Sequence, residues 1–370
     1  MEVVPLAPSC LVRDAPCVKV TRLRLQEFSA FKKVEIDFSP GINVFLGTNA
    51  TGKSHAMKAL YAPLRTFEQV GTTVPLEARL HEKLANVFKP DDGFMGRLVR
   101  RRKGQSQGSI HIEGTTGEIG LTLNTRTGRP PIELGAATWT SEASCIFLPT
   151  REVLAMYEGF IAAYQDRELS FDETYQDACI ALSRAVLRGP RSEQAKALIE
   201  PIEAALGGKV ALQGNRFYVV RKDGFMEAHL VAEGLRKIAG LAHLVLNGSL
   251  TRNAILFWDE PEANLNPRLV SLVVDVLLEL CKQGVQIFVT THDYLLSHKL
   301  SLLAEYGVHP GAPVRFFSFH REDGDGPVVV TPGGTLAELP DNPILDEFTA
   351  HYDFERRLFD GAAAGGEPAR

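Results

Sequence analysis

Residues 47–54 read Gly-Thr-Asn-Ala-Thr-Gly-Lys-Ser, and this octapeptide decides the fold because of what flanks it. A short apolar run, Ile-Asn-Val-Phe-Leu at residues 42–46, comes before it and is typical of a buried parallel strand. A helical pattern follows over residues 53–67. A G-x-x-x-x-G-K-[ST] segment between a strand and a helix predicts a phosphate-binding loop, in which backbone N–H groups and the helix N-terminus surround a phosphate.

The same motif predicts roles for its side chains. Lys53 is expected to reach the β- and γ-phosphate oxygens of a nucleoside triphosphate, and the Ser54 hydroxyl is expected to bind Mg²⁺. The alternative is a chance glycine turn before a helix, which the flanking strand and helix disfavour. The residues predicted to surround the nucleotide are Gly47, Thr48, Asn49, Ala50, Thr51, Gly52, Lys53 and Ser54.

A second apolar run, at residues 254–258, ends in two carboxylates, Asp259 and Glu260. A carboxylate at the end of a buried strand is costly unless it has a cation to bind. Asp259 is therefore predicted to hold Mg²⁺ through water, which leaves Glu260 to polarise an attacking water as a general base. An ordinary solvated acidic turn is the alternative, and the upstream phosphate loop disfavours it.

Two further segments complete a pattern that resembles the ABC-type ATPase heads of the SMC, RecF and OLD-like families. Residues 259–267 read Asp-Glu-Pro-Glu-Ala-Asn-Leu-Asn-Pro, and residues 289–293 read Val-Thr-Thr-His-Asp. The resemblance implies that the Asn-Leu-Asn-Pro segment is the D-loop and that His292 is the switch histidine that senses the γ-phosphate and orients the water. It is closest to compact bacterial AAA-family ATPases of the OLD-like type, without a long coiled coil or a Toprim domain.

Residues 229–237 lie where these families have their signature motif and open an apolar helix. The resemblance implies that this segment contacts the ATP of a second head. The usual serine is replaced by Ala232, so its hydroxyl contact to the γ-phosphate is missing, and Arg236 or Lys237 would be compensating cations. A plain capped amphipathic helix is the alternative. The signature residues implied to contact nucleotide are Ala232, Glu233, Gly234 and Lys237.

Two weaker signals lie elsewhere. Residues 149–152 follow an apolar run at the position of the family's Q-loop, but contain no glutamine, so that Glu152 is a candidate distal Mg²⁺ contact. Residues 97–103 read Arg-Leu-Val-Arg-Arg-Arg-Lys, a basic run that suits a nucleic-acid backbone or an acidic partner. A solvated loop is the alternative for this run.

The composition is that of an ordinary globular protein with a large core. The chain has 370 residues, 45% of them apolar and 23% charged, and its net charge of −5 gives no overall attraction to nucleic acid. Five scattered cysteines without a C-x-x-C pair disfavour a zinc site or a disulfide framework. The N-terminus lacks the pattern of a signal peptide, and the apolar runs are too short to span a bilayer, so a cytoplasmic protein is expected.

The predicted elements form one α/β head. A helical pattern over about residues 152–206 predicts an insertion, and strand–helix alternation over residues 255–319 predicts a parallel sheet. We therefore expect a P-loop NTPase of the ABC-ATPase head type over residues 18–359, with a flexible arm at residues 1–17 and a disordered tail at residues 360–370. Period-two alternation predicts strands of an antiparallel β lobe at residues 18–28, 33–38, 109–113 and 120–124.

These features predict an ATPase that uses ATP and Mg²⁺. The resemblance implies a homodimer whose heads enclose ATP and which drives or gates a separately encoded effector, in defence against phage. A DNA-binding repair ATPase of the RecF kind is one alternative. A scaffold or sensor that binds ATP without hydrolysing it is another, and the alanine at position 232 is the feature that favours it.

Overall fold

The structure is a computed structural model. It describes residues 18–68, 73–100, 107–125, 131–140, 143–167, 169–187, 193–251, 253–321 and 326–363. The arm predicted at residues 1–17 lies outside the described residues, and so do residues 364–370 of the predicted tail.

A six-stranded sheet lies at the centre of the molecule in the order β14-β13-β3-β12-β11-β7. Every neighbouring pair is parallel except β13 with β14, which confirms the predicted mostly parallel sheet. β3 and β12 are buried on both faces, as expected for inner parallel strands. The strands are β3 (Ile42–Leu46), β7 (Cys145–Leu148), β11 (Ile255–Asp259), β12 (Gln286–Thr291), β13 (Val314–Arg321) and β14 (Val328–Gly333).

The two faces of this sheet belong to separate hydrophobic cores. In β3, Val44 packs in the core that contains the helices α6, α7 and α8, whereas Phe45 packs in the core shared with α1 and the β lobe. The alternation follows from the pleat, since successive side chains point to opposite faces. The helices are α1 (Lys53–Glu68), α6 (Glu233–Leu246), α7 (Pro267–Lys282) and α8 (Tyr294–Glu305).

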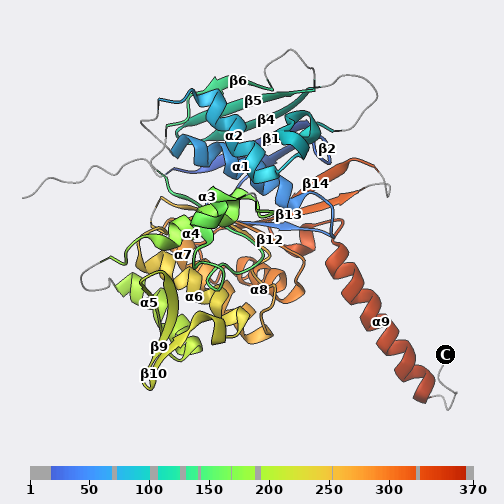
Figure 1. Ribbon diagram of the computed structural model, residues 1–370. Coiled ribbons are helices and arrows are strands. Elements are labelled where there is room, and N and C mark those ends of the chain that lie inside the picture. Colours follow the sequence, from blue (N-terminus) through green and yellow to red (C-terminus); the bar gives the residue numbers. More distant parts are fainter. Residues whose placement is uncertain are drawn as a thin grey trace, which may run out of the picture.

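An antiparallel sheet in the order β2-β1-β4-β5-β6 forms the β lobe, which Figure 1 shows above the central sheet. The predicted strands and the hairpin between β4 and β5 are confirmed. The edge strand β6 and the helix α2 were not predicted. The elements are β1 (Val20–Phe28), β2 (Phe31–Asp37), α2 (Leu76–Phe88), β4 (Gln107–Gly114), β5 (Gly117–Asn124) and β6 (Ile132–Ala137).

A helical segment and a small sheet connect β7 to α6. The helices α3 (Phe160–Asp166), α4 (Glu173–Ser183) and α5 (Glu193–Leu206) lie within the predicted helical insertion. They are followed by a three-stranded antiparallel sheet that was not predicted. Its strands are β8 (Lys209–Gln213), β9 (Arg216–Arg221) and β10 (Gly224–Glu227).

The last described element, α9 (Pro343–Ala363), projects away from the body of the molecule (Figure 1). It continues past residue 360, where a disordered tail was expected to begin. Within the described part of the chain, no helix has the length and apolar character needed to cross a membrane. The short 3₁₀ helices are η1 (Asp91–Gly93), η2 (Met95–Leu98), η3 (Ala228–Leu230) and η4 (Leu336–Glu338).

Candidate nucleotide site

The predicted site residues meet at one edge of the central sheet. Thr291 at the end of β12 pairs with Leu46 at the end of β3, and Asp259 at the end of β11 pairs with Thr290. The segments that leave the carboxyl ends of these parallel strands therefore lie side by side. This edge is the usual place for a ligand in an open α/β sheet.

The loop after β3 has a backbone that only glycine tolerates at two positions. Gly47 has a φ of 146° and Gly52 a φ of 87°. A Cβ at Gly47 would lie 2.3 Å from the carbonyl oxygen of Phe319, and one at Gly52 would lie 2.8 Å from the ring of Phe31. Residues 49–55 of this loop line a pocket of about 430 Å³ together with Glu260. The motif's glycines are therefore required by the space and dihedrals of the loop.

Lys53 lies folded inside this loop. Its Nζ donates hydrogen bonds to the carbonyl oxygens of Gly47 at 2.7 Å and Thr48 at 2.8 Å. Burial lowers the pKa of Lys53, while the nearby carboxylates of Glu260 and Asp259 act in the opposite direction. A buried ammonium held by two neutral carbonyls is a suitable partner for an anion such as phosphate.

Ser54 and Asp259, the two predicted metal ligands, are in direct contact. The Ser54 hydroxyl donates to Asp259 Oδ1 at 2.9 Å. Thr290 also donates to this oxygen, and its Oγ1 accepts the backbone N–H of Glu260 at 3.1 Å. Hydroxyl and carboxylate oxygens in this arrangement suit Mg²⁺. No separate role was predicted for Thr290 from the sequence, because threonine is a common residue in β-strands.

Glu260 and His292 face one another beside the same pocket. Glu260 has a left-handed backbone with a φ of 48°, held by a hydrogen bond from its N–H to the carbonyl oxygen of Thr290 at 3.2 Å. His292 Nδ1 lies 3.5 Å from Glu260 Oε1, and the histidine side chain is half exposed. A strained backbone at a carboxylate is characteristic of a functional position.

Glu262 is a buried acid behind this pair that the sequence did not reveal. Its Oε1 accepts hydrogen bonds from the Thr291 hydroxyl at 2.7 Å and the His292 N–H at 3.2 Å. Burial raises the pKa of Glu262, and these hydrogen bonds oppose that shift. Glu262 thus fixes the segment that carries His292, and is a positioning residue.

The predicted signature segment begins α6 and touches the D-loop. Ala232 is the N-cap of α6 and has no side-chain capping bond. Glu233 accepts a hydrogen bond from the Asn264 side chain at 2.8 Å. A Cβ on Gly234 would lie 2.7 Å from the carbonyl oxygen of Asn264. The start of α6 and the D-loop are therefore packed backbone to backbone.

Lys237 does not share the exposed position of Ala232. It is buried, and its Nζ donates to the carbonyl oxygens of Glu260 at 2.8 Å and Ala263 at 3.3 Å. Burial lowers the pKa of Lys237 to about 8. The helix turns between Ala232 and Lys237, so that the lysine points toward residues 260–263 and away from the exposed position of Ala232.

Arg236 and Glu152 form an ion pair with each other. Arg236 Nε lies 2.7 Å from Glu152 Oε1, and Glu152 Oε2 also accepts the N–H of Ala155 at 3.2 Å. The structure therefore uses Arg236 to hold the segment after β7. The sequence had offered Arg236 as a free cation and Glu152 as a distal metal contact, and their mutual pairing argues against both roles.

The basic run at residues 97–103 is described only in part. Arg97 pairs with Asp91 at 2.9 Å, and Arg100 lies 3.8 Å from Glu27. Residues 101–103 lie outside the described residues.

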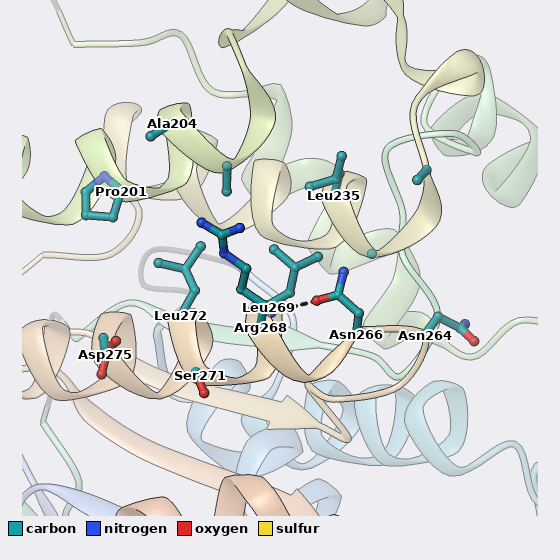
Figure 2. A pocket seen from close by; sticks show the side chains of 13 residues that line it. Pro201, Ala204, Leu235, Asn264, Asn266, Arg268, Leu269, Ser271, Leu272 and Asp275 are labelled. Atoms are coloured by element: carbon teal, nitrogen blue, oxygen red, sulfur yellow. Dashed lines mark hydrogen bonds between the residues drawn. The ribbon is translucent and has the colours of Figure 1, made fainter.

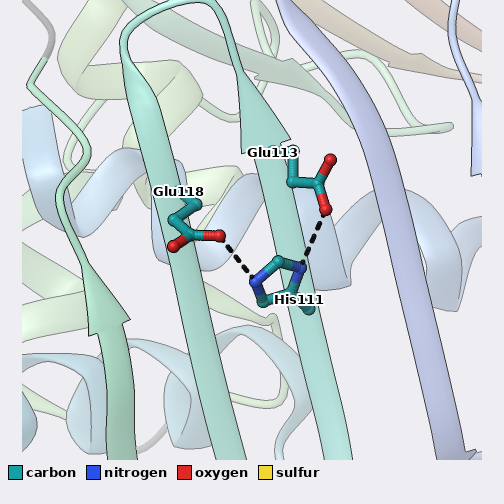
Figure 3. A group of neighbouring side chains, drawn as sticks. All are labelled: His111, Glu113 and Glu118. Atoms are coloured by element: carbon teal, nitrogen blue, oxygen red, sulfur yellow. Dashed lines mark ion pairs between the residues drawn. The ribbon is translucent and has the colours of Figure 1, made fainter.

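A cluster outside the predicted site occurs on the β lobe. His111 Nε2 lies 3.1 Å from Glu118, and His111 Nδ1 lies 3.5 Å from Glu113 (Figure 3). Arg24 bonds to Glu113 and lies 3.3 Å from His111 Nδ1. The arginine already supplies positive charge to these carboxylates, so the group is a cross-strand charge network rather than a metal site.

Comparison with known proteins finds two matching families. A family described as "AAA domain, putative AbiEii toxin, Type IV TA system" matches residues 149–297, and a family described as "AAA domain" matches residues 22–62. The first match spans the candidate base, D-loop and histidine. The second spans the phosphate loop.

Sequence relatives share a short segment. RecF, the DNA replication and repair protein, of Lactobacillus acidophilus is 44% identical over 39 residues, which cover 10% of each chain. RecF of Streptococcus pneumoniae is 49% identical over 39 residues, covering 10% of this chain and 11% of RecF. The match therefore spans about a tenth of these relatives' length.

One solved SMC head has a similar fold. The Smc head bound to the C-terminal winged-helix domain of ScpA superimposes with a TM-score of 0.50 at 15% identity, covering 86% of this chain and 98% of that one. The SMC head of Thermotoga maritima gives a TM-score of 0.45 at 15% identity, covering 85% and 99%. The two AAA matches, the RecF segment and the fold shared with the first of these heads support an ABC-type ATPase head similar to those of the SMC and RecF proteins.

Proposed function

We propose that this chain binds ATP with Mg²⁺, hydrolyses it, and works as a dimer whose two heads enclose the nucleotides. The observation that carries the proposal is that Ser54 and Glu260 line one pocket, and that Ser54 is hydrogen-bonded to Asp259 at 2.9 Å. A phosphate loop, a pair of metal ligands and an adjacent carboxylate are the parts that phosphoryl transfer to water requires.

In this proposal each side chain has one task. Lys53 exchanges its two carbonyl partners for phosphate oxygens, while Ser54 and Asp259 hold Mg²⁺. Mg²⁺ supplies positive charge to the phosphates when it is bound. Glu260 accepts the proton of the attacking water, and His292, 3.5 Å from Glu260, orients that water and the γ-phosphate.

The proposal assigns the start of α6 to the second head's nucleotide. Ala232 and Gly234 lie on a groove surface together with Asn264 of the D-loop. A helix N-terminus attracts phosphate through its free N–H groups and its dipole. We extend the proposal to a separately encoded effector that the dimer drives or gates, in defence against phage. The matched family, which carries the name of a toxin–antitoxin system, supports work beside a second gene product.

The test compares two variants of the pocket. Lys53→Ala should lose ATP binding, measured by calorimetry, because the phosphates lose their buried cation. Glu260→Gln should bind ATP as the wild type does but release phosphate about 10²–10⁴ times more slowly, the usual worth of a general base. It should also sediment as a dimer only when ATP is present. Unaltered phosphate release by Glu260→Gln would show that another group is the base.

A sensor that binds ATP without turning it over is a second candidate. It is favoured by Ala232, which offers no hydroxyl to a γ-phosphate, and by Arg236 and Lys237, which are engaged within their own chain. Tight ATP binding with phosphate release no faster than in buffer would select this candidate.

A RecF-like DNA-binding ATPase is a third candidate, favoured by the RecF segment. It predicts that DNA binds in a salt-sensitive way and is lost when residues 100–103 are neutralised. DNA affinity that survives this change would reject the assignment of the basic run.

A further inference from the structure

The helix α9 has an apolar face that the described part of the chain covers only at its base, where the ring of Phe348 stacks on Tyr294. At about 100° of rotation per residue, Phe348, Tyr352 and Phe359 lie within about 40° of one another around the helix. Their exposed fractions are 51%, 65% and 74%, and Leu358, which lies about 80° from Phe348 around the helix, is 44% exposed. Large aromatic side chains gathered on one exposed face mark a surface that binds another protein.

One carboxylate interrupts this apolar face. Glu355 lies between Phe348 and Leu358 around the helix and has no ion-pair partner among the described residues. Of the other acids in α9, Asp346, Asp353 and Asp360 recur at every seventh position and lie on the opposite side, and Glu347 lies about 100° from Phe348 around the helix. A charge in the middle of a contact face is costly unless the covering surface supplies a cation.

A groove between α5, α6 and α7 offers the complementary surface (Figure 2). It has a volume of about 740 Å³, and apolar side chains such as Ala204, Leu235 and Leu272 line it. Figure 2 shows Arg268 reaching from α7 across the groove toward α5 and α6. Arg268 is exposed, and within the described ranges it pairs with no acid. The other charge of the groove, Asp275, is already paired with Lys299 at 2.7 Å.

The helix and the groove of one chain do not meet. In Figure 1, α9 leaves the body beside β13 and β14, whereas α5 lies on the opposite side of the molecule. The first turn of α9 lies beside the phosphate loop, because Pro343 and Asp346 line one groove of about 470 Å³ together with Thr48 and Asn49. The groove that contains Arg268 begins at the start of α6, which is the segment proposed to contact the nucleotide of a second head.

We propose that α9 of one copy of this chain docks in the α5–α6–α7 groove of a second copy, where its Glu355 pairs with Arg268 of that copy. This inference rests on the proposed ATP-bound dimer, in which the phosphate loop of one head faces the start of α6 of the other. The beginning of α9 then lies at the mouth of the second copy's groove. The arrangement is a helix-in-groove contact.

The dimensions and symmetry fit this contact. The groove follows α7 from Arg268 to Asp275, which is about 10 Å at 1.5 Å per residue. The part of the aromatic face beyond Phe348, from Tyr352 to Phe359, is also about 10 Å long. In a two-fold symmetric dimer the contact occurs twice, since each head offers one α9 and one groove.

Cross-linking between two variants, each with one introduced cysteine, tests the contact directly. Both variants carry Glu260→Gln, and Cys10→Ser with Cys17→Ser; the three described cysteines are buried. Glu355→Cys is then mixed with Arg268→Cys and treated with a short bis-maleimide, with and without ATP. We expect a cross-linked dimer in the mixture when ATP is present.

The control replaces Asp353 by cysteine on the opposite side of α9. A cross-link from Asp353→Cys as strong as that from Glu355→Cys overturns the proposed face, and no cross-link from Glu355→Cys overturns the docking. Sedimentation of the same samples reports on the heads separately. An ATP-dependent dimer without a cross-link leaves the proposed function intact, and the absence of any dimer rejects the dimeric part of that function together with the docking.

Charge exchange tests the ion pair. In the Glu260→Gln background with ATP, Glu355→Arg or Arg268→Glu should each weaken the dimer at least about tenfold. The double variant should return to within about threefold of the parent, and Asp353→Arg should stay within that range. A Glu355→Arg dimer of unchanged affinity overturns the pairing. If this variant loses only a co-purifying effector, α9 binds that effector and the second copy is the wrong occupant.

Discussion

At the scale of single residues, the predicted site residues are held in place by neighbouring side chains that do not face the pocket themselves. Thr290 fixes both Asp259 and the backbone of Glu260, and Glu262 fixes His292. Motif spacing predicted the side chains that would face the nucleotide, because their chemistry is tied to fixed positions in a loop. It did not predict Thr290 or Glu262, whose task exists only once β11 and β12 pair.

Lys237 gives a prediction about pH. Its pKa is about 8 in the folded protein against an ordinary 10.5, because burial penalises the ammonium. Between these values the unfolded chain holds a proton that the folded chain lacks, so this residue makes the free energy of unfolding rise with pH. Urea unfolding should show the wild type gaining stability relative to Lys237→Met from pH 8 to pH 10.5. A constant or falling difference would place the proton on the folded lysine.

Ala232 gives a prediction about the cap of α6. A serine at an N-cap accepts an N–H bond of the first turn, which alanine cannot do. Ala232→Ser should therefore raise the free energy of unfolding without nucleotide by about 1 kcal/mol. The measurement is denaturant unfolding of both proteins. An unchanged midpoint would mean that another group already satisfies these N–H groups.

At the scale of elements, strands and helices with strong local signals were predicted and weaker ones were missed. The strand–helix alternation that contains α7 was predicted, because Asn266 and Pro267 mark the start of this helix and its apolar period is regular. The sheet β8-β9-β10 was missed although Gly214-Asn215 and Asp223-Gly224 are hairpin-turn pairs. α9 was missed because the end of the chain is rich in glycine and alanine, which disfavoured a helix there. Asn342 and Pro343 are nevertheless a helix-start signal, and the Asn342 side chain caps the helix.

The contact between α6 and the D-loop gives an element-scale prediction. Gly234→Ala would place a methyl group 2.7 Å from the backbone oxygen of Asn264, so one segment must move. We expect a loss of about 1–3 kcal/mol in the free energy of unfolding, as for other overpacked sites. Gly240→Ala is the matched control on the same helix, since its methyl would meet only the end of the Leu154 side chain. Equal losses for the two variants would mean that the D-loop backbone moves away from the added methyl group at no extra cost in stability.

At the scale of the whole molecule, nucleotide binding should stabilise the fold across both cores. The helix α1, which follows the phosphate loop, packs in one core, whereas the helix that follows His292 packs in the other. With MgATP at about 100 times its Kd, the free energy of unfolding should rise by about 2.7 kcal/mol. Thermal unfolding should show this shift for Glu260→Gln and none for Lys53→Ala. A shift that persists in Lys53→Ala would place the nucleotide elsewhere.

The ring of Tyr294 stacks on Phe348 at 4.3 Å between ring centres, and this contact joins the start of α8 to the base of α9. Tyr294 comes two residues after His292, so only a short stretch of chain separates the histidine from the base of this projecting rod. From Phe348 to Ala363 this rod is about 22 Å long, and a tilt of about 10° at its base would swing its tip by about 4 Å. The geometry is that of a lever arm, in which a small rotation at Phe348 becomes a displacement of several ångströms at the free end of the helix.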